Sequence, residues 1–301
     1  MCGIVGLFIK NPEMEADLGK HLSLMLAEMT DRGPDSAGAA IYHDPVASNS
    51  AKVTVLTDEQ DYSWDELSQK LKQAFGNSAS VSVHHDHAVL KLPVRPGEVQ
   101  NWLLQNHPEL RINSTGESIE IFKGKGSPND FIDNFDLASY SGTHALGHTR
   151  MATESAVTTE HSHPFSTGLD LCLVHNGSLS NHNRLREVLR KRGINFQTDN
   201  DSEVAAGYLA WRLQEGDSLD QALQNAIQDL DGFYTFAIGS KDGFAVLVDP
   251  VGCKPAVMAE TDDWAAMSSE FRAIATLPGV KNARIWEPVP AQIYSWQRSA
   301  T

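Results

Sequence analysis

The sequence predicts an α+β fold built from antiparallel β-sheets covered by helices. Helical and strand-like segments are interleaved along its 301 residues. Several strands follow one another with only a short turn between them, as do residues 233–238 and 244–248 around a glycine-bounded turn. Hairpins of this kind join antiparallel strands, whereas parallel strands need long crossovers. The pattern therefore favours antiparallel sheets over a parallel doubly wound sheet.

The first segments of the chain alternate between strand and helix. Residues 4–9 are almost all apolar and predict a buried first strand. Residues 12–29 predict a helix, because an apolar stripe recurs at helical spacing through Leu18, Leu22 and Met25. A loop rich in turn formers follows at 31–38, and a second strand is expected at 39–42.

Residues of about 46–140 are expected to form an inserted α+β segment, because they carry a periodicity of their own. A cluster of histidines, His84, His85 and His87, lies here in a strand-like context. Alternation along a strand would place His85 and His87 on one face. With no cysteine nearby, solvated or hydrogen-bonded histidines are favoured over a metal site.

The last part of the chain predicts short strands separated by polar turns and several helices. Strands are expected at 145–153, 171–177, 256–259, 265–267 and 293–296. Helices are expected at 185–192, 202–214, 219–230 and 270–275, with Asp201 as the N-cap of the second. The chain is thus predicted to be a single domain, 1–301, that carries one insertion.

Composition and charge disfavour several classes of protein. Acidic residues outnumber basic ones 39 to 24 and no Lys/Arg block stands out, which disfavours binding to nucleic acid or to an anionic membrane. No apolar run approaches the roughly 20 residues of a membrane helix, and the first residues do not have the form of a secretory signal. Cys2, Cys172 and Cys253 are too few and too scattered for a disulfide framework. We therefore expect a cytoplasmic protein.

Cys2 is a candidate nucleophile, because removal of Met1 would leave a thiol and a free α-amino group on one residue. An amine with an unperturbed pKa of about 7.7–8.0 can accept the thiol proton and so produce the thiolate, which is the attacking form. The alternative, from these residues alone, is that Cys2 is a small apolar residue at the start of a buried strand.

Two arginines are candidate ligand residues. Arg150 follows His148 in a predicted strand. Because a buried arginine is costly without a partner, it forms either a structural ion pair or a clamp for a carboxylate. Arg32 and Gly33 lie in a turn, for which a surface loop and a functional loop are equally good interpretations.

Asn176 and Gly177 directly follow an apolar strand. An Asn-Gly pair is foremost a turn former. The alternative is an oxyanion hole made from the Asn176 side-chain amide and the Gly177 N–H. Asp201 is expected mainly as a helix cap and could otherwise bind a substrate ammonium. Together with Cys2 and Arg150, these residues would form a site that cleaves the side-chain amide of an α-amino acid through a thioester.

In these motifs the chain resembles the class II glutamine amidotransferases, which are N-terminal-nucleophile hydrolases. The matching segments are residues 1–6 (MCGIVG), 32–38 (RGPDSAG), 147–150 (GHTR), 175–177 (HNG) and 200–203 (NDSE). The resemblance implies a four-layer αββα sandwich of two antiparallel sheets. It also implies a set of roles: nucleophile for Cys2, oxyanion hole for Asn176 and Gly177, glutamine binding for Arg150, Asp201 and Thr153, and support of the terminal amine and thiol for Arg32 and Gly33.

Within that family the chain is most similar to stand-alone glutaminase subunits of the glutamate-synthase type, including that of N-methylglutamate synthase, in residues 147–157, 161–165 and 200–207. This resemblance implies a chain without a cofactor of its own that cleaves glutamine and passes ammonia to synthase subunits. Any flavin or iron–sulfur cluster would sit on those partners. Two alternatives stay open: a subunit that acts with methylamine or γ-glutamylmethylamide, and a non-catalytic scaffold. The sequence shows no dinucleotide-binding or phosphate-binding loop for a synthase reaction.

Overall fold

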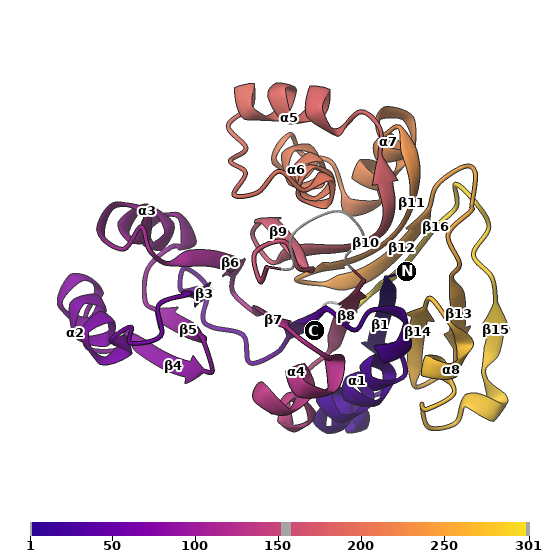
Figure 1. Cartoon of the computed structure of the whole chain (residues 1–301), viewed down its shortest axis with the longest axis horizontal. Coiled ribbons are helices and arrows are strands. Elements are labelled where there is room, and N and C mark those ends of the chain that lie inside the picture. Colours follow the sequence, from indigo (N-terminus) through magenta and orange to yellow (C-terminus); the bar gives the residue numbers. More distant parts are fainter. Residues whose placement is uncertain (1, 152–157, 299–301) are drawn as a thin grey trace.

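The computed structural model describes residues 2–151 and 158–298. Figure 1 shows two β-sheets facing each other, with one group of helices outside each sheet and a separate lobe at one side. The strand pairs of both sheets are antiparallel. The predicted four-layer αββα sandwich is thereby confirmed.

The seven-stranded sheet is built around the first strand of the chain. Its order is β15 (Arg284–Trp286), β13 (Val257–Glu260), β14 (Trp264–Ser268), β1 (Gly3–Ile9), β8 (His144–Arg150), β2 (Ser36–Tyr42) and β7 (Ile119–Lys125). Every residue of β1 is buried. Alternate side chains therefore enter different cores: Val5 and Leu7 face the outer helices, whereas Ile4 and Phe8 face the second sheet.

The five-stranded sheet has the order β16 (Ile293–Gln297), β12 (Gly243–Val248), β11 (Gly232–Ser240), β10 (Leu171–Leu179) and β9 (Phe165–Gly168). β11 and β12 form the hairpin that the sequence predicts. Between the two sheets, the Phe244 ring lies against Gly6, where an added Cβ would come within 2.6 Å of the ring. Gly6 therefore allows the two sheets to approach closely.

Helices cover the outer face of each sheet. The seven-stranded sheet carries α1 (Leu18–Ala27), α4 (Pro128–Asn134) and α8 (Phe271–Ile274), and the five-stranded sheet carries α5 (His182–Lys191), α6 (Asp201–Gln214) and α7 (Leu219–Asp229) (Figure 1). Short 3-10 turns lie at Pro12–Asp17, Thr30–Arg32, Leu137–Ser139 and Val280–Asn282. The N-cap of α6 is Asn200 and not Asp201 as predicted. Asn200 has an extended backbone and its side chain accepts a hydrogen bond from the Ser202 N–H, so Asp201 is the first helical residue.

The lobe at the side is a four-stranded antiparallel sheet with two helices. Its strand order is β4 (Ser80–His84), β5 (His87–Leu92), β3 (Ala51–Leu56) and β6 (Arg111–Gly116), and it packs against α2 (Trp64–Phe75) and α3 (Pro96–Asn106). This separate layer is shorter than the expected insertion at 46–140. The strand β7 pairs with β2 in the main sheet, and α4 packs on α1, so both belong to the sandwich.

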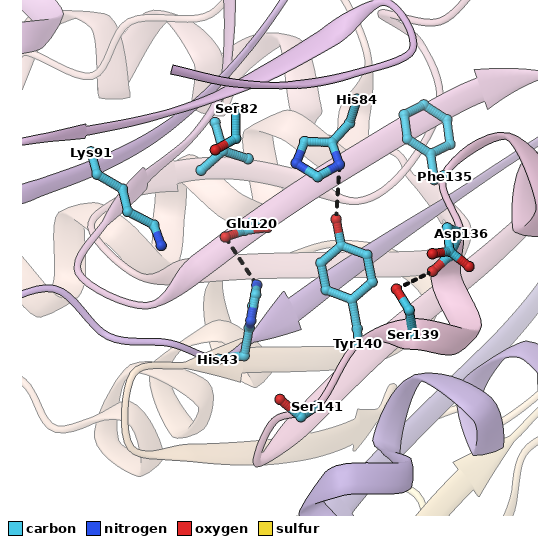
Figure 2. Close-up of a pocket in the computed structure, with 11 residues that line it drawn as sticks. His43, Ser82, His84, Lys91, Glu120, Phe135, Asp136, Ser139, Tyr140 and Ser141 are labelled. Carbon is cyan, nitrogen blue, oxygen red and sulfur yellow. Dashed lines mark hydrogen bonds and ion pairs between the residues drawn. The ribbon is translucent and has the colours of Figure 1, made fainter. Parts of the chain in front are cut away.

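The histidines of the lobe lie at a turn and not along one strand face. His84 and His87 pair across the β4–β5 hairpin, with His85 in the turn between them, which corrects the expected alternation. Figure 2 shows His84 pointing toward Tyr140 and His43 pointing toward Glu120, around a cavity of about 320 Å³ between the lobe and the sandwich. His87 is buried and hydrogen-bonds to Asp86 at 2.6 Å. These contacts are structural. Among the described residues, no group of three or more His, Cys, Asp or Glu side chains is placed so that it could hold a metal ion.

None of the helices in the described ranges is long and apolar enough to cross a membrane.

Candidate active site

Cys2 is held at the end of the central strand of the main sheet. The residues after it form β1, which lies between β8 and β14 (Figure 1). Gly3 pairs with Thr149, so Cys2 lies beside the end of β8 that carries Arg150. On the other side, the Ile4 N–H donates a hydrogen bond to the Ser269 hydroxyl at 3.0 Å. Cys2 itself is half-buried. The register of three strands therefore sets its position.

Two predicted site residues contact Cys2 directly. The Arg32 Nε donates to the Cys2 carbonyl oxygen at 3.1 Å, and the Asn176 Nδ2 lies 3.4 Å from the same oxygen. Arg32 is oriented by an ion pair of 2.7 Å with Glu270, which lies just after β14. The turn that contains Arg32 is therefore not a free surface loop, because its arginine connects the residue before β1 with a residue just after the neighbouring strand β14.

Gly33 and Arg150 also lie together. A Cβ added to Gly33 would come within 2.4 Å of the Arg150 backbone nitrogen, so only glycine permits this approach. The Asp35 N–H donates to the Arg150 carbonyl at 3.0 Å. The Arg150 side chain is buried, with 8% of its surface exposed, and its Nη1 lies 3.5 Å from the His161 carbonyl.

Asn176 and Gly177 lie inside β10 and do not form the turn that an Asn-Gly pair favours. The strand continues to Leu179, and Gly177 pairs with Tyr234 of β11. A Cβ at Gly177 would lie 2.0 Å from the Phe233 carbonyl oxygen, and its φ of 151° also favours glycine. Tertiary packing therefore overrides the local turn preference.

The backbone N–H of Gly177 faces the edge of β10 that is not paired with β11. Backbone groups of residues two apart in a strand point to the same side. The Leu179 N–H donates to the Asp201 Oδ2 at 2.9 Å, and the His175 carbonyl accepts from His148. Gly177 lies between these two positions, so its N–H is directed to the same edge as Asp201.

Asp201 is placed by the start of α6 against β10. Its carboxylate accepts from Leu179 and from the Ser202 hydroxyl, and Oδ1 lies 3.8 Å from the His175 Nδ1. The structure thus gathers Cys2, Arg32 and Asn176 by direct contact. Gly33 and Arg150 adjoin them at the end of β8, and Gly177 and Asp201 adjoin them along β10. Thr153 lies outside the described residues.

A network of buried histidines under this edge was not predicted from the sequence. The Ser202 hydroxyl lies 2.8 Å from the His175 Nδ1 and 2.9 Å from the His163 Nε2, and His148 stacks on His163. Burial lowers the pKa of all three imidazoles, that of His148 to about 3. They are therefore neutral at pH 7 and position Ser202 and the start of α6 without adding charge. No local pattern joins these positions, because they come from separate strands and a loop.

The arrangement combines a thiol, amide and backbone N–H donors, a guanidinium and a carboxylate. These groups are suited to binding a zwitterionic amino acid and to stabilising negative charge on a carbonyl oxygen. A cavity of about 610 Å³ lies elsewhere in the described part of the chain, because none of the candidate residues lines it.

Comparison with known proteins gives the same family. Residues 148–276 match a family described as a glutamine amidotransferase domain. The chain is 52% identical over 297 residues to the glutamine amidotransferase-like protein GlxB of Rhizobium meliloti, covering 98% of each chain. It is 29% identical to a putative glutamine amidotransferase of Methanothermobacter thermautotrophicus, over 98% of this chain and 99% of that one.

Other relatives match this chain over only part of their own length. A glutamine–fructose-6-phosphate aminotransferase of Vibrio parahaemolyticus is 36% identical over 124 residues, which is 20% of that protein. Among solved structures, a glutamine phosphoribosylpyrophosphate amidotransferase of B. subtilis matches with a TM-score of 0.59 at 21% identity, over 100% of this chain and 50% of that one. This likeness shows the shared fold. The near full-length match to GlxB shows that the chain belongs to the class II glutamine amidotransferases, enzymes that cleave the side-chain amide of glutamine.

Proposed function

We propose that this protein is a glutaminase subunit whose nucleophile is Cys2, after removal of Met1. The observation that carries the proposal is the contact of both Arg32 and Asn176 with the Cys2 carbonyl, which joins the nucleophile to its expected oxyanion donor. In the bound complex, Arg150 pairs with the α-carboxylate of glutamine and Asp201 with its α-ammonium. A planar guanidinium can hold a carboxylate through two parallel hydrogen bonds.

The reaction then proceeds in two halves. The free α-amine of Cys2 takes the thiol proton, and the thiolate attacks the side-chain carbonyl carbon. Asn176 and the Gly177 N–H stabilise the resulting oxyanion. When the C–N bond breaks, the α-amine returns the proton to the leaving nitrogen, which departs as ammonia and leaves a γ-glutamyl thioester. Water adds to the thioester, giving one proton to the amine, and glutamate leaves as the thiol re-forms.

We further propose that the ammonia passes to a synthase subunit of a glutamate-synthase-like complex in the cytoplasm. The resemblance of residues 147–157, 161–165 and 200–207 to glutaminase subunits of the glutamate-synthase type supports this proposal. In this proposal the chain needs no cofactor, and any flavin or iron–sulfur chemistry belongs to the partner.

The nucleophile is tested by intact mass and by glutaminase activity. We expect a mature mass without Met1 and loss of glutamate release in Cys2→Ala, with an unchanged melting temperature. Cys253→Ala is the matched control, because this thiol is exposed, and it should retain activity. Retained Met1 in an active protein would contradict the mechanism, since the amine would then be part of a peptide bond.

The partner is tested by purifying the native complex and comparing glutamine with γ-glutamylmethylamide as substrates. Glutaminase activity that rises on addition of the co-purified subunits supports delivery to a partner, and faster cleavage of the methylamide supports the alternative based on methylamine. Full activity of the isolated chain that no partner alters would contradict delivery. Cleavage of neither amide would favour the scaffold alternative.

A further inference from the structure

A cavity of about 610 Å³ lies where the four-stranded lobe meets the sandwich. Its walls come from α3, α6, the end of β3, β6, β7, β9 and the turn at 193–198. Figure 1 shows β6, β7 and β9 converging at this junction, and residues Thr115 and Leu169 form a bridge there. The volume falls in the range of small-molecule sites. This cavity is separate from the proposed glutamine site.

The wall of the cavity contains a buried lysine, Lys123 of β7. Its side chain is 5% exposed and lies on the strand face that carries Ile119 and Ile121 into the core between the sheets. Its Nζ lies 4.6 Å from the centre of the Phe165 ring. Burial lowers the pKa of Lys123 to about 8, so the amine is mostly a cation at pH 7. A cation in such a place normally has an anionic partner.

The described residues provide no such partner within ion-pair distance. The two carboxylates of the cavity wall are already engaged. Glu203 accepts hydrogen bonds from the Gln197 and Thr198 N–H groups and from the Thr198 hydroxyl, at 2.7–2.8 Å. Glu160 forms an ion pair with Arg111. The negative charge of Glu203 acts on Lys123 and raises its pKa, but the two groups form no ion pair. Direct contact with the Lys123 ammonium is therefore left to a group that enters the cavity.

Two hydroxyl groups of the same cavity are also without partners in the described part of the chain. The oxygens of Ser114 and Thr167 are buried and make no hydrogen bond. Both residues line the cavity, on β6 and β9 respectively. Leaving a buried hydroxyl unpaired costs stability, and such groups are often completed by a ligand or by water. Apolar side chains, Leu56, Leu110 and Ile194, form another part of the wall.

We propose that this cavity is a second ligand site, which binds a small organic carboxylate. The carboxylate pairs with the Lys123 ammonium and accepts hydrogen bonds from the Ser114 and Thr167 hydroxyls, while the hydrocarbon part of the ligand contacts the leucines and Ile194. Arg111 of the same wall is paired with Glu160, so Lys123 is the cation that meets the ligand. One such cation with neutral donors fits a monoanion, and the apolar wall favours an organic acid over inorganic phosphate.

Calorimetric titration of the whole chain tests the proposal with defined probes. The probes are benzoate and n-butyrate, with butyramide as the neutral analogue of butyrate and inorganic phosphate as the inorganic anion. We expect saturable one-to-one binding of at least one carboxylate and none of butyramide. In Lys123→Met the binding should weaken at least about tenfold, the loss of one charge-assisted contact. Lys72→Met, which removes an exposed charge from α2, should bind as the unaltered chain does.

Several results would overturn the site. Carboxylate binding that is equal in Lys123→Met and the unaltered chain would place the ligand elsewhere, for instance at Arg150. Binding of phosphate alone, or of no carboxylate below tens of millimolar, would also contradict it. If Lys123→Met does not fold, the double variant Ser114→Ala/Thr167→Val decides: weaker binding by about tenfold supports the site and unchanged binding rejects it. These titrations need no turnover, so they are independent of the proposed reaction.

Discussion

The side-chain amide of Asn176 lies 3.4 Å from the carbonyl oxygen of Cys2, although 174 positions separate the two residues in the sequence. Asn176 belongs to β10 of one sheet, and Cys2 precedes β1 of the other. The contact therefore spans the sandwich and brings a hydrogen-bond donor to the proposed nucleophile. The amide nitrogen of Asn176 is the donor in this contact and the backbone carbonyl of Cys2 is the acceptor.

The first prediction concerns this amide. Asn176→Ala should lower kcat about 10²–10³-fold, because one oxyanion donor is lost, and should change KM for glutamine little. Steady-state glutaminase assays measure both constants. Asn106→Ala, at an exposed position on α3, is the control and should have no effect. A rise in KM with unchanged kcat would instead show that Asn176 binds glutamine in its ground state.

The second prediction concerns Arg150. Arg150→Lys should raise KM for glutamine at least about tenfold with a smaller effect on kcat, because a single ammonium cannot replace two parallel hydrogen bonds to a carboxylate. The assay uses a wide range of glutamine concentrations. Loss of kcat with unchanged KM would exclude a role in carboxylate binding. A melting curve separates either result from unfolding, since Arg150 is buried.

The third prediction concerns Arg32, which connects Glu270 to the Cys2 carbonyl. Arg32→Met should lower kcat/KM roughly 10–100-fold, the size expected for loss of one hydrogen bond from a charged donor. The nucleophile would be positioned less well, while Cys2 itself would remain. Labelling of the Cys2 thiol by iodoacetamide should still occur, in contrast to Cys2→Ala. Unchanged kcat/KM would show that β1 alone positions Cys2.

The fourth prediction concerns acid stability. Burial lowers the pKa of His144 and of His148 to about 3, whereas an unfolded histidine titrates near 6.5. Below pH 6.5 the unfolded chain binds more protons than the folded one. The stability that these histidines contribute is therefore complete above pH 6.5 and is lost as the pH falls toward 3. Between pH 7.5 and pH 5, each histidine should lower the free energy of unfolding by about 2 kcal/mol.

Urea unfolding at a series of pH values measures how the free energy of unfolding depends on pH. In His144→Asn the slope between pH 7.5 and pH 5 should be smaller by the uptake of about one proton, whatever the substitution does to stability at pH 7.5. His85→Gln is the control, because this side chain is 54% exposed, and it should leave the slope unchanged. Equal slopes in all three proteins would mean that His144 titrates alike in both states.

The sequence by itself determined the elements and the inventory of chemical groups. Periodicity along α1, the hairpin of β11 and β12, and the apolar strand β10 can all be found in short windows, because side-chain alternation is a local property. The motifs around Cys2, Arg150 and Asp201 indicated the chemistry for the same reason. A prediction from local sequence was wrong where long-range strand pairing opposed the local preference. Asn176 and Gly177 favour a turn, yet they lie within a strand because pairing with β11 continues past them.

Only the tertiary structure decided which groups meet. The assignment of β7 to the main sheet depends on its pairing with β2, and this pairing places Lys123 in a cavity wall. The contacts of Cys2 depend on the registers of two sheets and on a loop held by Glu270. Each such contact joins residues far apart in the chain, and its formation is governed by packing and strand register, which no local window of the sequence contains.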